Sequence, residues 1–270
     1  MTTSKLRRTD DVRDAAQAGE PRLPADASSA GPLPAVVGAP AKSASFVLVA
    51  GFATIVACLF VFGTVAEGIR ENEVFVLDTL ATPFLHGLAS PMLDAVMTGA
   101  TTIGSGVALA LLVALTATAL SARRRFGAAL FLIVSAGGAF LLNGIMKPFF
   151  HRPRPQLPWS HVLPDYSFPS GHTMDSAAFF LAIAVIVWSI AGRRAGVLTL
   201  VAMTLVTALI GVSRIYLGFH YFTDVVGGAI AGLAWLLVAL AAFRSRRLAP
   251  LWAPRAATAA GRRARTPDAR

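Results

Sequence analysis

Six long apolar segments constrain the fold of this chain more than any other feature of its sequence. Each is near the ~20 residues that an α-helix needs to cross the hydrocarbon core of a bilayer. Backbone N–H and C=O groups find no water there, so each segment has to satisfy them within itself, as a helix does. The sequence therefore predicts an all-α fold, a polytopic bundle of six transmembrane helices. The segments are Ser45–Ala66, Thr98–Ala122, Phe126–Met146, Thr173–Ala191, Gly196–Val212 and Val225–Phe243.

The composition agrees with a membrane protein. Charged residues make up 14% of the 270 residues, whereas a soluble domain has about a quarter. The alternating pattern of a transmembrane β-barrel is absent. The first apolar segment is longer than a signal-peptide core and lacks a clear cleavage site, so we interpret it as an anchor. Cys58 is the single cysteine, which excludes an intramolecular disulfide and a Cys-based metal site.

The net charge of +10 indicates topology rather than nucleic-acid binding. With six spans both termini lie on one side of the membrane, and 19 of the 24 Lys and Arg residues fall on that side. The positive-inside rule places this side in the cytoplasm. The basic C-terminal tail is then a solvated tail, with a weak interaction with anionic lipid as the alternative. The remaining cations are Arg70, Lys147, Arg152, Arg154 and Arg214.

Two polar tails flank the predicted membrane domain, which covers residues 44–244. Residues 1–43 have no apolar period and are rich in Ala, Pro, Asp and Arg, so we expect a disordered cytoplasmic tail. Residues 245–270 predict a second disordered, basic cytoplasmic tail. Between the first two spans, Glu67–Met97 has apolar residues at near-helical spacing, interrupted by two prolines. We expect one or two short extracytoplasmic interfacial helices there, as a connector or, alternatively, as a substrate rim.

Three groups of polar residues lie at the ends of the apolar segments, and the predicted topology brings all three to the extracytoplasmic face. Charged side chains are costly beside hydrocarbon, so their presence requires a reason. Their convergence on one face favours a single site over three unrelated anchoring or capping roles. The groups are Lys147 with Arg154-Pro155, then Pro169-Ser170-Gly171-His172, then Ser213-Arg214 with His220 and Asp224.

The first group supplies cations. Six residues separate Lys147 from Arg154, and the prolines around them predict that the helix ends and an extended turn follows. A guanidinium donates two hydrogen bonds to a phosphate, and an ammonium adds a point charge. Taken alone, Lys147, Arg152 and Arg154 would be anchors at the membrane interface.

The second group opens a helix. Ser170 is a good N-cap residue, and the free amides at a helix start bind anions. Gly171 allows the backbone to approach a phosphate closely, and His172 is a candidate general acid at the membrane surface. The alternative is an ordinary cap with an interfacial histidine. Asp175, one turn further, either tunes His172 or faces a wet cavity, and we favour the cavity.

The third group is the most specific. His220 and Asp224 are four residues apart and can face each other on one helical turn. The carboxylate would keep one ring nitrogen protonated and leave the other free to attack, as in a catalytic triad. Arg214 would bind the same phosphate. The alternative is a loop histidine and an aspartate that stabilises the start of the last helix.

These spacings resemble the signature of the type 2 phosphatidic acid phosphatase superfamily. Its three parts are Lys-x6-Arg-Pro, Pro-Ser-Gly-His and Ser-Arg-x5-His-x3-Asp, and this sequence matches all of them without a departure. The resemblance also covers the six-span layout, but neither tail. It implies a metal-independent phosphatase, without a cofactor, that works through a phosphohistidine. By this resemblance His220 is the nucleophile, Asp224 orients it and His172 protonates the leaving oxygen. The implied phosphate-binding residues are Lys147, Arg154, Ser170, Gly171 and Arg214.

The residues agree with catalysis without a metal. Phosphoryl transfer depends on positioning and charge stabilisation, and three cations and a helix N-terminus can supply both. The other histidines, His86, His151 and His161, are scattered rather than spaced as metal ligands. We interpret His151 and His161 as surface residues that flank the site, with contact to the substrate as the alternative.

The sequence therefore predicts a lipid phosphate phosphatase that acts in the outer leaflet. Its Ala- and Arg-rich composition suits a bacterial inner membrane. Candidate substrates are phosphatidic acid, phosphatidylglycerol phosphate, an isoprenoid diphosphate such as undecaprenyl diphosphate, and lipid A phosphate. The same signature occurs in vanadate-dependent haloperoxidases, but those are soluble and six spans disfavour them. A non-catalytic lipid-binding or transport protein is the other alternative, which the complete set of His172, His220 and Asp224 disfavours.

Overall fold

The computed structural model describes residues 41–160 and 163–244. The chain divides into two units, Met1–Val47 and Leu48–Arg270, and all contacts reported below lie within the second. The two predicted tails fall outside the described residues, except that residues 41–43 belong to the first helix.

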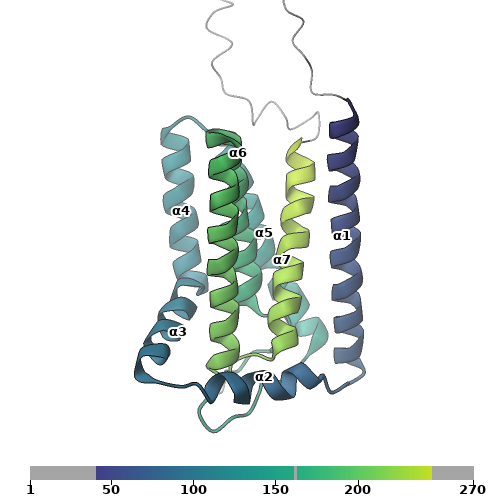
Figure 1. Ribbon diagram of the computed structural model, residues 1–270, viewed down its shortest axis with the longest axis vertical. Coiled ribbons are helices and arrows are strands. Elements are labelled where there is room, and N and C mark those ends of the chain that lie inside the picture. Colours follow the sequence, from purple (N-terminus) through teal and green to yellow (C-terminus); the bar gives the residue numbers. More distant parts are fainter. Residues whose placement is uncertain (1–40, 161–162, 245–270) are drawn as a thin grey trace, which may run out of the picture. The chain divides into compact units, whose positions relative to one another are not determined.

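The described residues form seven helices and no strand, which confirms the predicted all-α class (Figure 1). Large apolar side chains on several of these helices are exposed, as expected for surfaces that face lipid. The helices are α1 (Ala41–Arg70), α2 (Val76–His86), α3 (Pro91–Ile103), α4 (Gly106–Ala122), α5 (Phe126–Phe150), α6 (Gly171–Tyr216) and α7 (Phe222–Arg244).

Four of these helices, α1 from Val49 onward, α5, α6 and α7, are long and apolar enough to cross a membrane. A fifth crossing results if α3 and α4 count together, although they are bent by 56°. The predicted second span, Thr98–Ala122, is therefore wrong as one continuous helix. Gly104 ends α3, and the Ser105 hydroxyl accepts a hydrogen bond from the Ala108 amide and starts α4. A glycine C-cap followed by a serine N-cap separates two helices.

The 46-residue element α6 folds back on itself at Gly192. This glycine has φ 83°, in the left-handed region that side chains disfavour. A Cβ placed on Gly211 would lie 3.6 Å from Thr173 Cγ2, whereas a straight helix would separate these residues by about 57 Å. The two halves of α6 therefore run antiparallel, and they correspond to the predicted segments Thr173–Ala191 and Gly196–Val212.

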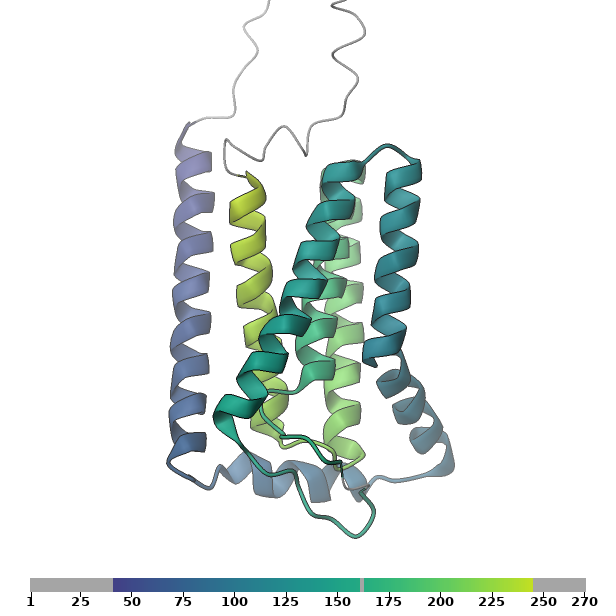
Figure 2. The ribbon, with the colours of Figure 1, turned by 180° about the vertical axis from the view of Figure 1, so that it is seen from behind.

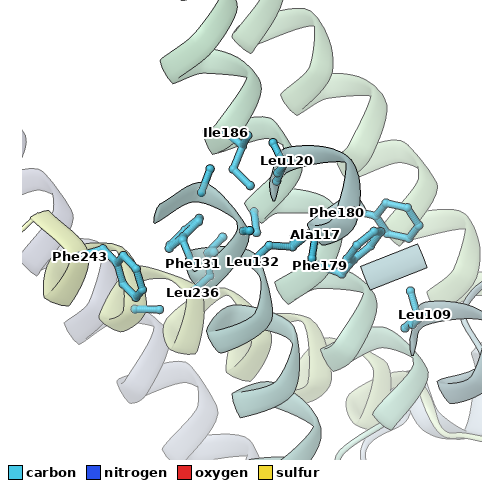
Figure 3. Packing of buried hydrophobic residues seen from close by; sticks show 14 of the residues in the cluster. Leu109, Ala117, Leu120, Phe131, Leu132, Phe179, Phe180, Ile186, Leu236 and Phe243 are labelled. Atoms are coloured by element: carbon cyan, nitrogen blue, oxygen red, sulfur yellow. The ribbon is translucent and has the colours of Figure 1, made fainter. Parts of the chain in front are cut away.

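Helices α4 to α7 pack around one apolar cluster, shown in Figure 3. Phe131 and Leu132 of α5 are fully buried, and Phe179 of α6 and Leu236 of α7 pack into the same cluster. In lipid, such close packing rather than exclusion of water holds helices together. This cluster fixes where the helix ends lie.

The helix ends that carry the three predicted polar groups lie near α2. Helix α2 lies across one end of the bundle in Figure 1, and the view from behind shows the connection from α5 to α6 at that same end (Figure 2). Helix α5 extends two residues beyond Pro148, which the sequence had predicted to stop it, and its C-cap His151 is left-handed with φ 51°. The end of α5, both ends of α6 and the start of α7 therefore meet in one place.

Candidate active site

A polar cavity of about 230 Å³ contains residues from all three predicted groups. Six of the eight candidate site residues line it, while Ser170 and Asp224 lie behind its wall. The lining residues are Gly104, Gly106, Phe140, Asn143, Lys147, Arg154, Leu163, Asp165, Gly171, His172, Asp175, Arg214 and His220.

The buried imidazole of His220 has a defined orientation. Its Nδ1 lies 3.4 Å from Asp224 Oδ2, so the predicted contact forms, although His220 precedes α7 instead of sharing a helical turn with Asp224. Its Nε2 lies 3.1 Å from Arg154 Nη1. A guanidinium only donates hydrogen bonds, so Nε2 accepts and the ring proton is on Nδ1. Burial lowers the pKa of His220 to about 4, although Asp224 opposes the shift. His220 is therefore neutral at neutral pH, with an unprotonated nitrogen directed at Arg154.

The Asp224 carboxylate is fully buried in the first turn of α7 and is held from several sides. Its Oδ2 accepts hydrogen bonds from the Tyr221 amide, at 2.9 Å, and from the Ser167 hydroxyl. Its Oδ1 accepts one from Arg152 Nη1 at 2.6 Å. Charge-assisted bonds of this kind compensate for burying the carboxylate.

Two of the cavity cations already hold an anion. Lys147 Nζ pairs with one oxygen of Asp165, and Arg154 Nη2 lies 2.7 Å from the other. Burial alone would raise the pKa of Asp165, but Lys147 and Arg154 hold it below its usual range. The Asp165 side chain is 49% exposed, so an incoming anion can reach the position that it occupies.

The third cation, Arg214, is almost fully buried. Its guanidinium lies over the Phe219 ring, 4.2 Å from the centroid, and its Nη1 donates to Thr101 Oγ1 at 2.7 Å. Its Nε has no hydrogen-bond partner among the described residues. Arg214 therefore lines the cavity with one buried donor that has no partner among the described residues.

The start of α6 offers backbone amides. The amide of Met174 makes the first hydrogen bond of the helix, to the Ser170 carbonyl, so the amides of residues 171–173 have no partner within the helix. A Cβ on Gly171 would lie 2.9 Å from Asn143 Oδ1. The glycine is thus required by the close approach of α5, in addition to any approach of a ligand.

The Ser170 side chain differs from the expected N-cap. It occupies the N-cap position but makes no capping hydrogen bond. Its buried hydroxyl instead accepts a hydrogen bond from Thr173 Oγ1 at 3.1 Å, and its amide donates to the Asp224 carbonyl at 3.0 Å. Ser170 therefore joins the start of α6 to the start of α7.

Sequence reasoning missed several polar residues of this site. Arg152 had been grouped with possible surface anchors, yet its side chain is only 12% exposed. Its position among the few cations outside the predicted cytoplasmic side was the one signal available. His161 lies outside the described residues, and His151 is exposed and does not line the cavity. The missed residues are Asp78, Asn143, Arg152, Asp165 and Ser167.

Comparison with known proteins agrees with this geometry. The model of the PAP2 superfamily matches residues 128–248. Phosphatidylglycerophosphatase B of Bacillus subtilis (strain 168) is 31% identical over 180 residues, which cover 65% of this chain and 88% of that protein. The chain belongs to the PAP2 superfamily. This confirms the family that the three motifs resemble.

Other PAP2 proteins are similar over different extents. Phosphatidylglycerophosphatase B of Escherichia coli (strain K12) is 33% identical over 90 residues, 33% of each chain. The crystal structure of a transmembrane PAP2-type phosphatidylglycerolphosphate phosphatase from Bacillus subtilis superposes with a TM-score of 0.66 at 26% identity. That match covers 72% of this chain and 97% of the other. This PAP2 protein is therefore a multi-pass membrane phosphatase.

Proposed function

We propose that this PAP2 protein hydrolyses a phosphate monoester or diphosphate of a membrane lipid through a phosphohistidine at His220. The orientation of the His220 ring carries the proposal. Its unprotonated Nε2 lies 3.1 Å from Arg154 Nη1, and its Nδ1 lies 3.4 Å from Asp224 Oδ2. One ring nitrogen faces a carboxylate that can orient the ring, and the other faces a cation that can hold the phosphate. Activated nucleophiles need an arrangement of this kind.

The reaction then has two steps. Nε2 of His220 attacks phosphorus, the bond from phosphorus to the leaving oxygen breaks, and His172, acting in its protonated form, gives that oxygen a proton and becomes neutral. Asp224 stabilises the positive charge on the phosphorylated ring. Water next attacks phosphorus, His172 takes a proton from it, and the phosphorus–nitrogen bond breaks. Inorganic phosphate leaves and both histidines return to their starting states.

The cations supply the charge stabilisation that the transferring group needs. Lys147, Arg154 and Arg214 all line the cavity that contains His220. Amides at the start of α6, at Gly171 and the residue after it, add donors that suit phosphate oxygens. Ser170 contributes through its place at that helix start.

An apolar cavity beside the polar one supports a lipid as the substrate. It has a volume of about 600 Å³ and lies between α4 and α5. The two cavities share Gly106, Phe140 and Asp175. A molecule with a phosphate in the polar cavity can therefore place an apolar chain in the other, where burial of the chain adds binding energy.

Phosphatidylglycerol phosphate is the first substrate to test, because the related Bacillus subtilis proteins are phosphatases of that lipid by name. Phosphatidic acid, undecaprenyl diphosphate and lipid A phosphate offer the same terminal phosphate on an apolar anchor. Phosphate release by the purified protein from each of these lipids, with a soluble phosphate ester for comparison, tests the proposal. Hydrolysis of the soluble ester alone would exclude a lipid phosphatase.

We expect activity to persist in EDTA and to be inhibited by vanadate. Three cations from the chain provide the positive charge that metal ions supply in other phosphatases, and vanadate adopts a trigonal-bipyramidal form like the transferring phosphoryl group. Phosphate release is measured with and without EDTA, with added magnesium as the control. Loss of activity in EDTA that magnesium restores would contradict a metal-independent mechanism.

For the membrane topology we propose six crossings: α1, the bent pair α3–α4, α5, each half of α6, and α7. Helix α2 lies at the extracytoplasmic interface beside the active site, and residues 44–244 form the phosphatase domain between two cytoplasmic tails. The support is charge: Arg123–Arg125 and Arg193–Arg194 lie at the turns after α4 and within α6, at the end opposite α2 (Figure 1). The positive-inside rule places that end in the cytoplasm.

Single-cysteine labelling tests this topology. In a Cys58→Ala background, a membrane-impermeant maleimide should label Gln156→Cys in intact cells but not Arg193→Cys. Both positions are exposed, so access across the membrane is the main difference between them. Permeabilised cells provide the control, in which both should react. The opposite labelling pattern would place the site on the cytoplasmic side.

A further inference from the structure

Arg152 makes a buried set of contacts that the reaction above does not use. Its Nη1 donates to Asp224 Oδ1 at 2.6 Å and to Thr223 Oγ1 at 2.8 Å, and its Nη2 donates to Asp78 Oδ2 at 2.6 Å. Its guanidinium lies 4.2 Å from the centroid of the Tyr221 ring. The side chains of the two carboxylates are 5% and 0% exposed, so Arg152 is a cation enclosed between two buried anions.

We propose that Arg152 and Asp78 are positioning residues that hold Asp224 in the orientation that keeps Nδ1 of His220 protonated. This inference rests on the proposed role of His220 as nucleophile. Neither Arg152 nor Asp78 lines the polar cavity, whereas Arg154, two residues further along, does. Their effect on the reaction is therefore exerted through Asp224 rather than by contact with the phosphate.

The contacts fix the carboxylate of Asp224 from both sides. One oxygen, Oδ2, lies toward His220, while Arg152 binds the other oxygen. The backbone of Arg152 contributes as well, because its carbonyl accepts the Ser167 amide at 2.8 Å, and the Ser167 hydroxyl donates to Asp224 Oδ2. A carboxylate bound at both oxygens cannot rotate its Oδ2 away from the imidazole without breaking charge-assisted hydrogen bonds.

Asp78 extends this network to α2. Its Oδ1 accepts the Thr223 amide at 2.8 Å, and its Oδ2 accepts the Thr223 hydroxyl at 2.7 Å. Asp78 thus occupies unpaired donors at the start of α7, a position that also favours a negative charge. Helix α2 is therefore more than a connector, since it supplies the anion that fixes Arg152 and the first turn of α7.

Arg152, Asp78 and Asp224 compensate for one another's buried charges, so removing any one of the three should disturb the other two. Without Arg152, two carboxylates would be buried with no cation between them, and an unpaired buried charge is costly. Without Asp78, Arg152 would keep one carboxylate and gain freedom to move. Catalysis by an oriented group can fall by about 100-fold for a displacement of about 1 Å, so both changes should reduce the rate of the chemical step.

The test compares Arg152→Gln, Arg152→Lys and Asp78→Asn with a matched control, Arg70→Gln. Arg70 is an exposed cation at the end of α1, outside the network. We expect Arg152→Gln to lower kcat by about 100-fold with little change in KM for the lipid phosphate. Asp78→Asn should lower kcat less, Arg152→Lys should recover part of the loss, and Arg70→Gln should match the parent.

A double mutant separates positioning from simple loss of stability. If Arg152 and Asp78 act through one network, Asp78→Asn should have little further effect on kcat in the Arg152→Gln background, because coupled residues are not additive. Fully additive losses, parental kcat in Arg152→Gln, or a raised KM with unchanged kcat would each overturn the inference. Should Arg152→Gln fail to fold, the kcat and KM of Asp78→Asn and Arg152→Lys decide by the same criteria.

Trapping of the phosphoenzyme distinguishes this inference from the proposed function. With labelled substrate and rapid quenching, Arg152→Gln should still form an acid-labile phosphoenzyme, but more slowly than the parent. If the parent forms that species and Arg152→Gln forms it at the parental rate, only the role of Arg152 is excluded. If the parent forms none and His220→Ala remains active, the proposed function fails, and this inference fails with it.

Discussion

Replacing His220 with alanine should abolish turnover and the acid-labile phosphoenzyme, while the protein still folds and inserts. The imidazole has its unprotonated Nε2 at 3.1 Å from Arg154 Nη1, and His220 lines the polar cavity. Among the described residues that line this cavity, His220 is the one whose ring nitrogen faces a buried carboxylate. In triad enzymes, loss of the nucleophile or its base costs about 10⁶-fold in kcat. Rapid quenching with a lipid labelled in its terminal phosphate measures both losses.

A neighbouring histidine provides the control for this substitution. His151→Ala removes an exposed ring that does not line the cavity, so its turnover should remain near that of the parent. Thermal unfolding in detergent should show that both variants fold, because neither histidine belongs to the apolar cluster of α4 to α7. Near-parental activity in His220→Ala would exclude His220 as the nucleophile.

Asp224→Asn should lower kcat by roughly 10⁴ with little effect on KM, by analogy with the aspartate of catalytic triads. Asparagine keeps the size of the side chain but loses its charge. Its amide can donate a hydrogen bond to Nδ1, which would move the ring proton to Nε2 and leave the wrong nitrogen free. Asp224 lies behind the cavity wall, so substrate binding should change little. Steady-state kinetics on the preferred lipid phosphate measure both parameters.

Arg214→Ala is the matched comparison, because Arg214 lines the cavity with one buried donor that has no partner among the described residues. By the proposed mechanism it binds the phosphate in both the ground state and the transition state, so its loss should raise KM and lower kcat together. An Asp224→Asn variant with raised KM and parental kcat would contradict the orienting role. Asp224 would then be a charge that stabilises the start of α7.

The sequence predicts the convergence of the site because topology alone determines it. Once six apolar segments are assigned, Lys147, His172, Arg214 and Asp224 must lie at helix ends on the same side, and the structure places them around one cavity or directly behind its wall. The contact between His220 and Asp224 also forms, but His220 makes it from the turn before α7 and not from a shared helical turn. The convergence of the helix ends needs only the assignment of the spans and the chain direction.

The supporting residues could not be predicted, because their partners lie far away along the chain. Arg152, in the connection from α5 to α6, binds Asp224, and Asp78 of α2 binds Arg152 and the Thr223 amide at the start of α7. No periodic pattern marks Arg152 or Asp78. The break at Gly104 was equally hidden, since an apolar segment can continue through a glycine. Ser170 resembled an ordinary cap, and only packing against α7 explains why its amide is bonded to the Asp224 carbonyl.

The ion pairs of Asp165 change what binding at this site means. Lys147 and Arg154 already share one counterion, the carboxylate of Asp165 on the connection from α5 to α6. A phosphate that binds to these cations has to replace the Asp165 carboxylate, because the cations are not unpaired in the protein without ligand. The electrostatic gain is then only the difference between two anions competing for the same donors. A lipid head group whose apolar tail occupies the neighbouring apolar cavity competes with Asp165 at a high local concentration. A free anion has no such anchor, and it has to displace a carboxylate that is covalently part of the chain.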